Sequence, residues 1–292
     1  IWPVRGLGRV LTEAGKARVS LGRLQEILDT PPETDPPGAL DGPIDGDIEF
    51  DDVRFAYGDV PVLRGVSFRV ARGTTLGILG ATGSGKTTVA HLLCGLYDLN
   101  EKREKHGQIR IGGTDIRKFK RSRLRESVGI VLQEPFLFSR TIRENIASFS
   151  PVPLERIREA AALAQIDESI LRFVSGYDTL VGERGVTLSG GQKQRAAIAR
   201  TILKNPPILI FDDSFSAVDT ETDAKIGAAL RRRVEGVTTL IIAHRVSSVS
   251  WADAVMVMEN GRVAEFGPPA ELLERGGVYK RLRDMQALSE EN

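Results

Sequence analysis

Residues 80–87 read Gly-Ala-Thr-Gly-Ser-Gly-Lys-Thr and match the pattern G-x-x-x-x-G-K-[ST]. The apolar run before them, residues 75–79, predicts a buried strand, and residues 88–93 after them predict a helix. Between a strand and a helix this pattern indicates a phosphate-binding loop. Glycine lets the backbone turn tightly beside an anion, and the helix N-terminus adds N–H donors and a positive dipole. We therefore expect Lys86 to reach the β- and γ-phosphates of a nucleotide and the Thr87 hydroxyl to hold Mg²⁺.

The composition limits the class of protein further. The chain has 292 residues, enough for one large domain or two small ones, and its net charge of +1 gives no general attraction to nucleic acid. The single cysteine, Cys94, cannot form an internal disulfide, which fits a reducing compartment. No apolar run approaches the roughly 18 residues of a membrane span, and we identify no signal peptide. Because the chain begins with Ile1 and not with methionine, we expect it to be part of a longer polypeptide.

Residues 1–30 are predicted to form a helix, because leucine and alanine recur at steps of three and four residues from Leu7 to Leu28. Three glycines weaken this prediction. Two interpretations stay open: a helix packed on a partner helix, or the cytoplasmic end of a helix that leaves a membrane, with basic residues on the inner side. The proline-rich residues 31–46 stop the helix and predict a stiff linker, which leaves residues 47–292 as the main domain.

Three more apolar runs, each predicted to be a buried strand, end in polar residues: residues 128–132 before Gln133, residues 207–211 before Asp212 and Asp213, and residues 237–242 shortly before His244. Open α/β sheets bind their ligands beyond the carboxyl ends of their strands. Asp212 is therefore a candidate for holding the Mg²⁺ that Thr87 also binds, and Asp213 could face an attacking water. Taken alone, Gln133 is equally well a loop residue, and His244 is better interpreted as a structural histidine.

Residues 188–192, Leu-Ser-Gly-Gly-Gln, open a helix predicted to cover residues 193–203. Ser189 is a good N-cap, and the glycines leave the helix N-terminus bare, which makes a second potential anion site. The alternative is an ordinary helix start.

Alternating apolar residues over residues 48–70 predict antiparallel strands, and Tyr57, which follows the first of them, is by itself best interpreted as a surface aromatic. Residues 255–266 predict a late hairpin with Asn260 and Gly261 in its turn.

Taken in order, these motifs resemble those of the ATP-binding cassette ATPases. The string at residues 188–192, which is called the signature motif or signature segment, is the specific one, because most other P-loop proteins lack it. The resemblance covers residues 48–292, and residues 132–138, residues 181–185 and the N-terminal helix are similar to the exporter branch of the family. It implies an α/β fold: a P-loop NTPase core with a mostly parallel sheet, an antiparallel β subdomain, and a helical subdomain that carries the signature motif.

The resemblance also implies a shared site. Two such domains dimerise head to tail, with ATP between the P-loop of one and the signature segment of the other, so the expected partner is a second nucleotide-binding domain in a hetero- or homodimer. A transmembrane domain of the same polypeptide would use the hydrolysis of ATP to export a substrate, with this domain at the cytoplasmic face of the membrane. No nucleic-acid partner is expected. Residues 216–219 would lie across the dimer seam.

The resemblance assigns a role to each matching residue. The residues expected to bind the nucleotide are Tyr57, which would stack on adenine, Gly80, Ala81, Thr82, Gly83, Ser84, Gly85, Lys86, Thr87, Thr88, Ser189, Gly190, Gly191 and Gln192. The residues expected at Mg²⁺ are Thr87, Gln133 and Asp212. The residues expected to act in catalysis are Asp213, His244, at the γ-phosphate, and Gln133, at the attacking water.

One position departs from the family pattern, which has glutamate where this chain has Asp213. The intrinsic pKa values of the two acids are similar, about 3.9 and about 4.3, so basicity is not the difference. Asp213 is shorter by one methylene, and a misplacement of about 1 Å can slow a reaction roughly 100-fold. Heterodimeric exporters resemble this, with one weakened site and one complete site. We therefore expect tight binding of ATP and slow hydrolysis at this P-loop.

Other functions stay open beside this one. The chain could be half of a homodimeric exporter in which Asp213 suffices as the base, or a largely non-catalytic clamp that ATP closes in support of a partner's site. Relatives that act on DNA or ribosomes would carry coiled-coil insertions or a second cassette, and neither occurs in this sequence. A GTPase is disfavoured because the chain has no Asn-Lys-x-Asp string.

Overall fold

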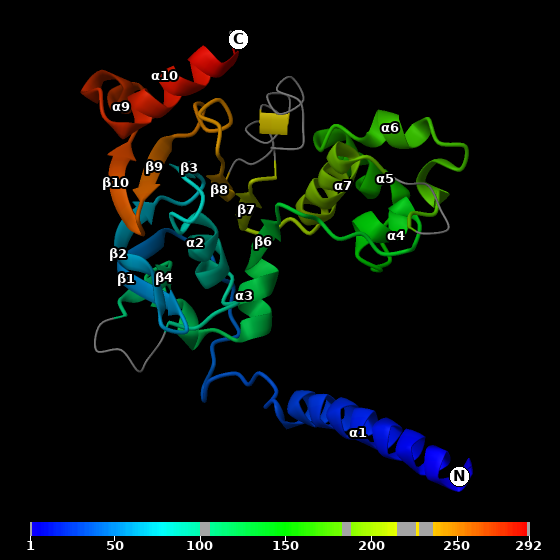
Figure 1. The fold of residues 1–292 in the computed structure, drawn as a ribbon. Helices are drawn as coiled ribbons and strands as arrows, with labels where there is room; N and C mark the ends of the chain where they lie inside the picture. Colours follow the sequence, from blue (N-terminus) through cyan, green and yellow to red (C-terminus); the bar gives the residue numbers. More distant parts are fainter. Residues whose placement is uncertain (1, 100–105, 183–187, 215–225, 228–235, 291–292) are drawn as a thin grey trace. The chain divides into compact units, whose positions relative to one another are not determined.

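The computed structural model of the chain describes residues 2–99, 106–182, 188–214, 226–227 and 236–290 (Figure 1). Residues 183–185 and 216–219, to which the sequence assigned exporter and dimer-seam roles, lie outside the described residues. The chain divides into two compact units, residues 1–37 and residues 38–292. Across the described residues, no helix combines the length and the apolar character that a bilayer crossing requires.

The first unit contains the helix α1 (Trp2–Asp29), which runs without a break through Gly8, Gly15 and Gly22. The large apolar side chains from Val10 to Leu28 are exposed, among them Leu24. Such a stripe stabilises a helix only when another apolar surface covers it. The stripe that predicted the helix is therefore also a surface for packing, and its role as a connection to a membrane domain stays a prediction.

The second unit begins earlier than residue 47. The Leu40 N–H donates to the carbonyl of Lys118 over 2.8 Å, and the Lys120 N–H donates to the carbonyl of Leu40 over 3.0 Å. Ile44 is buried in the core of the unit. The last part of the expected linker thus packs on the domain through the backbone hydrogen bonds of Leu40 and the buried side chain of Ile44, while the domain boundaries themselves stay a prediction.

The strands and helices of the second unit follow one another along the chain, with these bounds: β1 (Ile48–Tyr57), β2 (Val60–Val70), β3 (Thr75–Gly80), α2 (Lys86–Leu93), β4 (Gln108–Ile111), β5 (Thr114–Asp115), the 3-10 turn η1 (Ile116–Lys118), α3 (Arg121–Ser127), β6 (Val128–Val131), α4 (Ile142–Ala147), α5 (Leu154–Leu163), α6 (Asp167–Leu171), the 3-10 turn η2 (Gly176–Asp178), α7 (Gly190–Leu203), β7 (Ile208–Asp212), β8 (Thr238–Ile242), β9 (Ala254–Glu259), β10 (Arg262–Gly267), α9 (Pro269–Arg275) and α10 (Val278–Glu290).

The larger sheet has the strand order β10-β9-β3-β8-β7-β6. The neighbouring strands β9, β3, β8, β7 and β6 all run parallel to one another, and only β10 is antiparallel to its neighbour in this sheet. Every residue of β7 is buried: Ile208 and Ile210 face one core cluster, while Leu209 and Phe211 face the other. A parallel sheet covered on both faces requires such unbroken apolar strands. The core of the unit therefore lies on both sides of this sheet.

The smaller sheet has the order β2-β1-β4-β5 and is antiparallel, which confirms the antiparallel strands predicted for residues 48–70. In Figure 1 its strands lie below β10 and β9 and beside α2. Phe50 of β1 stacks on Phe68 of β2, with ring centroids 4.5 Å apart. The core cluster on this face joins these aromatic side chains to α2, so the phosphate-loop helix is held between the two sheets.

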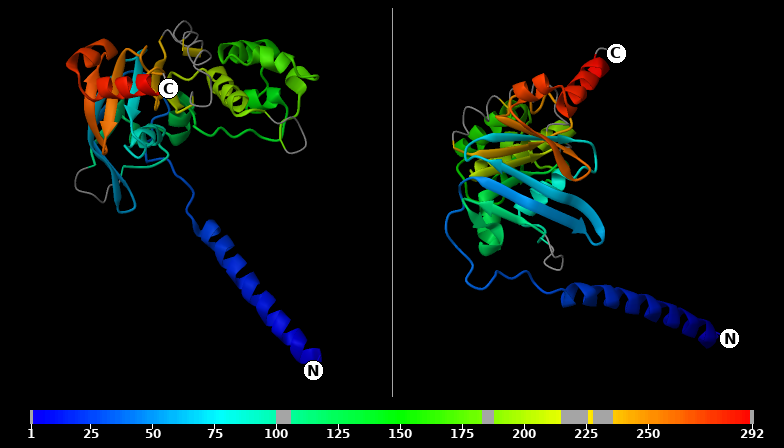
Figure 2. Two further views of the ribbon diagram at one scale, coloured as in Figure 1. Left: turned by 45° about the horizontal axis from the view of Figure 1, so that its top comes forward. Right: turned by 90° about the vertical axis from the view of Figure 1, so that its left-hand side faces the viewer.

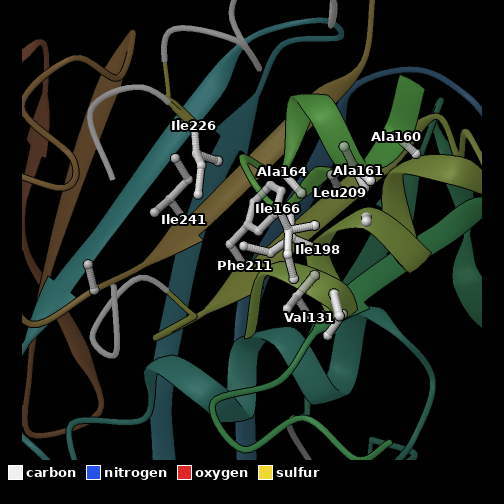
Figure 3. Close-up of a cluster of buried hydrophobic side chains, with 14 of the residues drawn as sticks. Val131, Ala160, Ala161, Ala164, Ile166, Ile198, Leu209, Phe211, Ile226 and Ile241 are labelled. Atoms are coloured by element: carbon white, nitrogen blue, oxygen red, sulfur yellow. The ribbon is translucent and has the colours of Figure 1, made fainter. Parts of the chain in front are cut away.

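The helices α4, α5, α6 and α7 form a separate group beyond β6 (Figure 1). Figure 3 shows how this group joins the sheet: Ile166, just before α6, and Ile198 of α7 pack with residues of β7, Phe211 and Leu209. Small residues of α5, Ala160 among them, let α5 and α7 approach closely. The helical subdomain therefore shares its core with the strand that ends in Asp212.

Several predicted element boundaries differ from the structure by one to three residues, and two of the differences affect site residues. The strand predicted over residues 128–132 ends at Val131, and Leu132 is 45% exposed, so Gln133 lies in a loop after the strand and not at its tip. The helix predicted to start at residue 193 begins at Gly190. It starts earlier because the Ser189 cap determines the first turn directly.

The predicted hairpin of β9 and β10 is confirmed, with Asn260 and Gly261 at φ of 49° and 76°. Two positive φ values define a type I′ turn, and glycine fits its second position best. The Gly261 N–H also donates to the carbonyl of Ser84 over 3.2 Å, so this turn lies against the phosphate loop. In Figure 2, α9 and α10 lie beside these two strands at one end of the unit.

Replacing Gly261 by alanine should destabilise the domain. A Cβ at this position would lie 2.0 Å from the carbonyl oxygen of Val62. Gly113 is the matched control, because its φ is also positive, 77°, but its Cβ would meet nothing within 4 Å. Both changes cost about 1–2 kcal/mol for a left-handed backbone, and G261A adds about 1–3 kcal/mol for the clash. Urea unfolding measures both free energies, and equal losses for G261A and G113A would contradict the argument.

Candidate nucleotide-binding site

The phosphate loop stands between β3 and α2, where the sequence placed it. The N-cap of α2 is Gly85, with φ of 100° and no side chain to cap the helix. The first N–H groups of α2 therefore have no capping side chain, and the positive end of the helix dipole points at the same place. This combination suits an anion.

Gly80 shows why the loop needs glycine. Its φ is 154°, and a Cβ on it would lie 2.4 Å from the carbonyl oxygen of Met258 and 2.7 Å from Ser84 Oγ. The loop thus folds back against β9 with no room for a side chain. Among the described residues, Ser84 Oγ is buried without a hydrogen-bond partner. Buried hydroxyls are seldom left without a partner, so a bound ligand, ion or water is expected to supply one here.

Lys86 is 5% exposed, and its Nζ donates to the carbonyls of Gly80 and Ala81 over 2.7 and 2.9 Å. Burial lowers the pKa of Lys86, and the nearby Asp213 and Asp212 carboxylates oppose this shift. The side chain lies folded over the loop that it is expected to complete. Phosphate oxygens would be stronger acceptors than these two carbonyls, because they carry charge.

Thr87 and Asp212 meet at the mouth of the loop. The Thr87 hydroxyl donates to Asp212 Oδ1 over 3.0 Å, although the two residues are 125 positions apart. Burial raises the pKa of Asp212, and Asp213 raises it as well, whereas the Thr87 hydrogen bond lowers it. A cation bound close to Thr87 Oγ1 and Asp212 Oδ1 would stabilise the ionised carboxylate of Asp212. A hydroxyl and a carboxylate are oxygen ligands of the kind that Mg²⁺ takes.

The remaining polar residues gather at the carboxyl ends of the parallel strands. Asp213 follows β7, and its N–H donates to the carbonyl of Ile242 over 2.9 Å. The N–H of Ala243, just before His244, donates to the carbonyl of Ile78 over 3.1 Å. These bonds tie the ends of three neighbouring strands together, so side chains far apart in the sequence reach one place.

A pocket of about 310 Å³ lies at this place. The residues that line it are Tyr57, Val62, Thr82, Gly83, Gly85, Lys86, Thr87, Thr88, Gln133, Asp212, Asp213, Ile242 and His244. Gly80, Ala81 and Ser84 stand at the back of the loop and line a second hollow of about 280 Å³. The structure therefore brings the sequence-predicted catalytic and metal-binding residues together with most of the phosphate loop.

Tyr57 ends β1 at the rim of the pocket and is 37% exposed. Its ring packs edge-on against Phe55 and Tyr97, with centroids 5.0 Å away in each case. Its hydroxyl lies 3.5 Å from Thr88 Oγ1. Tyr97, which follows α2 and supports the ring of Tyr57, was not among the residues predicted for the site. A flat base entering the pocket would meet an aromatic ring held in place by two others.

The signature residues lie elsewhere. Ser189 Oγ accepts from the N–H of Gln192, and Gln192 Oε1 accepts from the N–H of Ser189, which is a capping box. Ser189 and Gly190 are exposed. Residues 189–192 are all described, and none of them lines the pocket. The helix N-terminus is therefore capped by its own residues and not bare as the sequence suggested, and the exposed residues of this motif are Ser189 and Gly190.

The segment around Gln133 is held by side chains of α7 that the sequence analysis did not identify. Gln194, 1% exposed, donates from Nε2 to the carbonyl of Leu132 over 3.1 Å. Arg200 donates to the carbonyls of Phe136 and Asn145 over 2.9 and 2.7 Å, and burial lowers the pKa of this guanidinium. The helix that starts at Ser189 therefore also fixes the backbone on both sides of Gln133.

Residues 63–216, more than half of the chain, match the family described as ABC transporter. The chain belongs to the ABC transporter family. The match starts in β2 and includes the phosphate loop, Gln133, the signature segment, Asp212 and Asp213, while the remainder of this ABC transporter chain extends beyond it. The observed architecture is that of the P-loop NTPase core with the antiparallel and helical subdomains expected from the sequence.

Individual relatives agree with this assignment. The uncharacterized ABC transporter ATP-binding protein YknU of Bacillus subtilis (strain 168) is 44% identical over 291 residues, which cover 98% of this chain and 49% of that protein. The ATP-dependent lipid A-core flippase of Escherichia coli (strain K12) is 39% identical over 288 residues, covering 97% and 49%. The structure of a bacterial Atm1-family ABC exporter with ATP bound matches with a TM-score of 0.84 at 40% identity, covering 96% of this chain and 49% of that one. The chain thus spans about half the length of the relatives it matches.

Proposed function

We propose that this chain binds ATP with Mg²⁺ in the 310 Å³ pocket and hydrolyses it slowly. The observation that carries the proposal is the convergence of Lys86, Thr87, Asp212, Asp213 and His244 on one cavity from three separate parts of the chain. Lys86 and the first turn of α2 would hold the phosphates, and Tyr57 would stack on the base. Hydrolysis in such a site proceeds mainly by positioning and by stabilisation of charge.

The donor set at the mouth of the loop fits Mg²⁺. Thr87 Oγ1 and Asp212 Oδ1 are already within 3.0 Å of each other, and Gln133 adds an amide oxygen across the same pocket. Bound there, Mg²⁺ would neutralise charge on the phosphates. The residues of this chain would do the rest: Asp212 orients the Thr87 hydroxyl, and Gln133 and Asp213 face the space where a water would be held.

Asp213 is the reason to expect slow hydrolysis. Its φ is 46°, in the left-handed region that aspartate tolerates better than most residues. The backbone therefore turns sharply just where β7 ends and directs the short carboxylate into the pocket. One methylene less than glutamate leaves the carboxylate further from the water that it is expected to orient, and the rate of hydrolysis depends steeply on that distance.

The signature segment is expected to serve a second subunit. Ser189 and Gly190 are exposed, lie outside the pocket of their own chain, and form the capped N-terminus of α7. In a head-to-tail dimer they would close the pocket of the facing nucleotide-binding domain. We propose that such a dimer, joined to a transmembrane domain of the same polypeptide at the cytoplasmic face of a membrane, powers export. Export is the class of activity that the names of the flippase and exporter relatives describe.

Gly190 offers a test of the head-to-tail arrangement. A Cβ at Gly190 meets nothing within 4 Å, and a carboxylate in the first turn of α7 would favour the helix itself. In Gly190→Asp it would instead repel the triphosphate of the facing subunit. We expect the wild-type chain to sediment as a dimer with Mg²⁺ and a hydrolysis-resistant ATP analogue, and the Kd for dimerisation of G190D to rise at least about tenfold, a shift of about 1.4 kcal/mol.

The neutral variant Gly190→Asn is the matched control, because it has nearly the same size as aspartate. We expect G190N to keep most of the dimer and both variants to bind ATP as single chains like the wild type. Dimers of G190D as stable as those of the wild type would contradict the shared site.

A second candidate function, the ATP-gated clamp, is favoured by the same Asp213. In that case ATP would close the dimer, and this site would not turn over. A single-turnover experiment with enzyme in excess over radiolabelled ATP separates the two. Release of one phosphate per bound ATP supports a slow ATPase, whereas full recovery of intact ATP after hours supports the clamp.

A further inference from the structure

The C-terminal helix α10 reaches the loop that carries His244. Gln286 Nε2 donates to the carbonyl of His244 over 2.7 Å, and the N–H of Val246 donates to Gln286 Oε1 over 2.8 Å. One side-chain amide thus bonds the backbone on both sides of Arg245. Of the neutral side chains, only those of asparagine and glutamine carry an amide with one oxygen acceptor and two N–H donors, and glutamine is the longer of the two.

The helix that carries Gln286 is itself anchored. Glu265 of β10 accepts from the N–H groups of Val278 and Tyr279 over 2.7 and 2.9 Å, which places a carboxylate at the positive end of α10. Tyr279 is 1% exposed and packs in the same core cluster as Phe211 of β7. Gln286 lies about two turns further along this fixed helix, so its amide approaches the His244 loop from a rigid support.

The loop needs such a support. After β8, the Ala243 N–H bonds to the carbonyl of Ile78, and the Val249 N–H bonds to the carbonyl of Val246. Between these two bonds the chain leaves the sheet, and the side chain of His244 is exposed at the pocket. The direction of an exposed ring follows from the backbone that carries it. The amide of Gln286 is bonded to that backbone at the carbonyl of His244 itself.

We propose that Gln286 is a positioning residue, which holds the backbone of His244 so that the imidazole meets the γ-phosphate of bound ATP. This inference rests on the proposed function, in which His244 contacts that phosphate. Without the two hydrogen bonds, the loop would keep its ends but the ring would sample several directions. ATP, which has the γ-phosphate, would lose affinity, and ADP, which lacks it, would not.

Gln286→Met tests this directly, because methionine keeps the length and volume of the side chain and removes the donor and the strong acceptor. We expect the Kd for a hydrolysis-resistant ATP analogue to rise by up to about tenfold, as for one lost hydrogen bond, while the Kd for ADP stays within twofold. Single-turnover hydrolysis should slow by roughly 10- to 100-fold. Lys280→Ala is the control, because Lys280 is exposed on the same helix.

The double variant Q286M/H244A separates positioning from general damage. If Gln286 acts through His244, the double variant should bind the ATP analogue no more weakly than H244A alone, since residues in one unit are not additive. Hydrogen exchange at the Val246 amide should speed up in Q286M, with the unfolding midpoint close to that of K280A.

Three outcomes would overturn the inference: equal losses of ATP-analogue and ADP affinity in Q286M, additive losses in the double variant, or ATP-analogue affinity in Q286M equal to that of the wild type. A wild-type chain that binds neither nucleotide would instead overturn the proposed function, and this inference with it.

Discussion

Replacing Lys86 by methionine is expected to abolish nucleotide binding. Methionine keeps the buried stem of the side chain, so the core around α2 stays filled, but it removes the charged donor that now bonds Gly80 and Ala81. Hydrogen bonds from a charged group to phosphate contribute about 1.5–3 kcal/mol each. Two of them correspond to an increase in Kd for ATP of at least about 100-fold. Isothermal titration calorimetry with a hydrolysis-resistant ATP analogue measures it.

The control for this change is again Lys280→Ala, in which an exposed lysine is removed far along the chain from the loop. The unfolding free energy of Lys86→Met should be checked beside it, because the carbonyls of Gly80 and Ala81 lose their donor. A folded Lys86→Met variant that binds the analogue within threefold of the wild type would show that the pocket does not hold the phosphates.

The second large expected effect is an increase in the rate of ATP hydrolysis. Asp213→Glu should raise the rate of single-turnover hydrolysis by about 100-fold, because the carboxylate moves closer to the attacking water by about 1 Å. The affinity for ATP should not change, since Asp213 is not expected to bind the phosphates. The left-handed φ of 46° suits glutamate less well than aspartate, so a small loss of stability, below about 1–2 kcal/mol, is expected as well.

Asp213→Asn serves as the opposite change at the same position. It keeps the size of aspartate and removes the charge, and its hydrolysis should fall below that of the wild type. If Asp213→Glu hydrolyses ATP within twofold of the wild type while it stays folded and binds ATP, the reach of this side chain is not what limits the reaction.

The sequence predicted the parts of the site whose chemistry depends on local spacing. The glycines of residues 80–85 and the adjacent Lys86 and Thr87 form one contiguous string, and the capping serine at residue 189 precedes its own helix. The polar residues after the apolar runs could be placed as well, because neighbouring parallel strands end at one edge of a sheet. Asp212, at the end of β7, is thereby brought to the phosphate loop after β3, where its Oδ1 lies 3.0 Å from Thr87 Oγ1.

Contacts between a side chain and a distant backbone could not be predicted. Gln286 bonds the His244 loop 42 positions away, and Gln194 bonds Leu132 62 positions away. Every residue has a backbone carbonyl, so the sequence does not show which carbonyl a distant side chain will bond. For the same reason Tyr97 went unnoticed, and Tyr57, judged alone, favoured an ordinary surface position, whereas the structure places it on the wall of the pocket.

The most direct measurement of the central claim is a crystal structure of the chain with Mg²⁺ and a hydrolysis-resistant ATP analogue. We predict that Lys86 Nζ leaves the carbonyls of Gly80 and Ala81 for the β- and γ-phosphates, that Mg²⁺ lies between Thr87 and Asp212, and that Ser189 of a facing subunit closes the site. A nucleotide bound elsewhere, with Lys86 still on those carbonyls, would contradict the account.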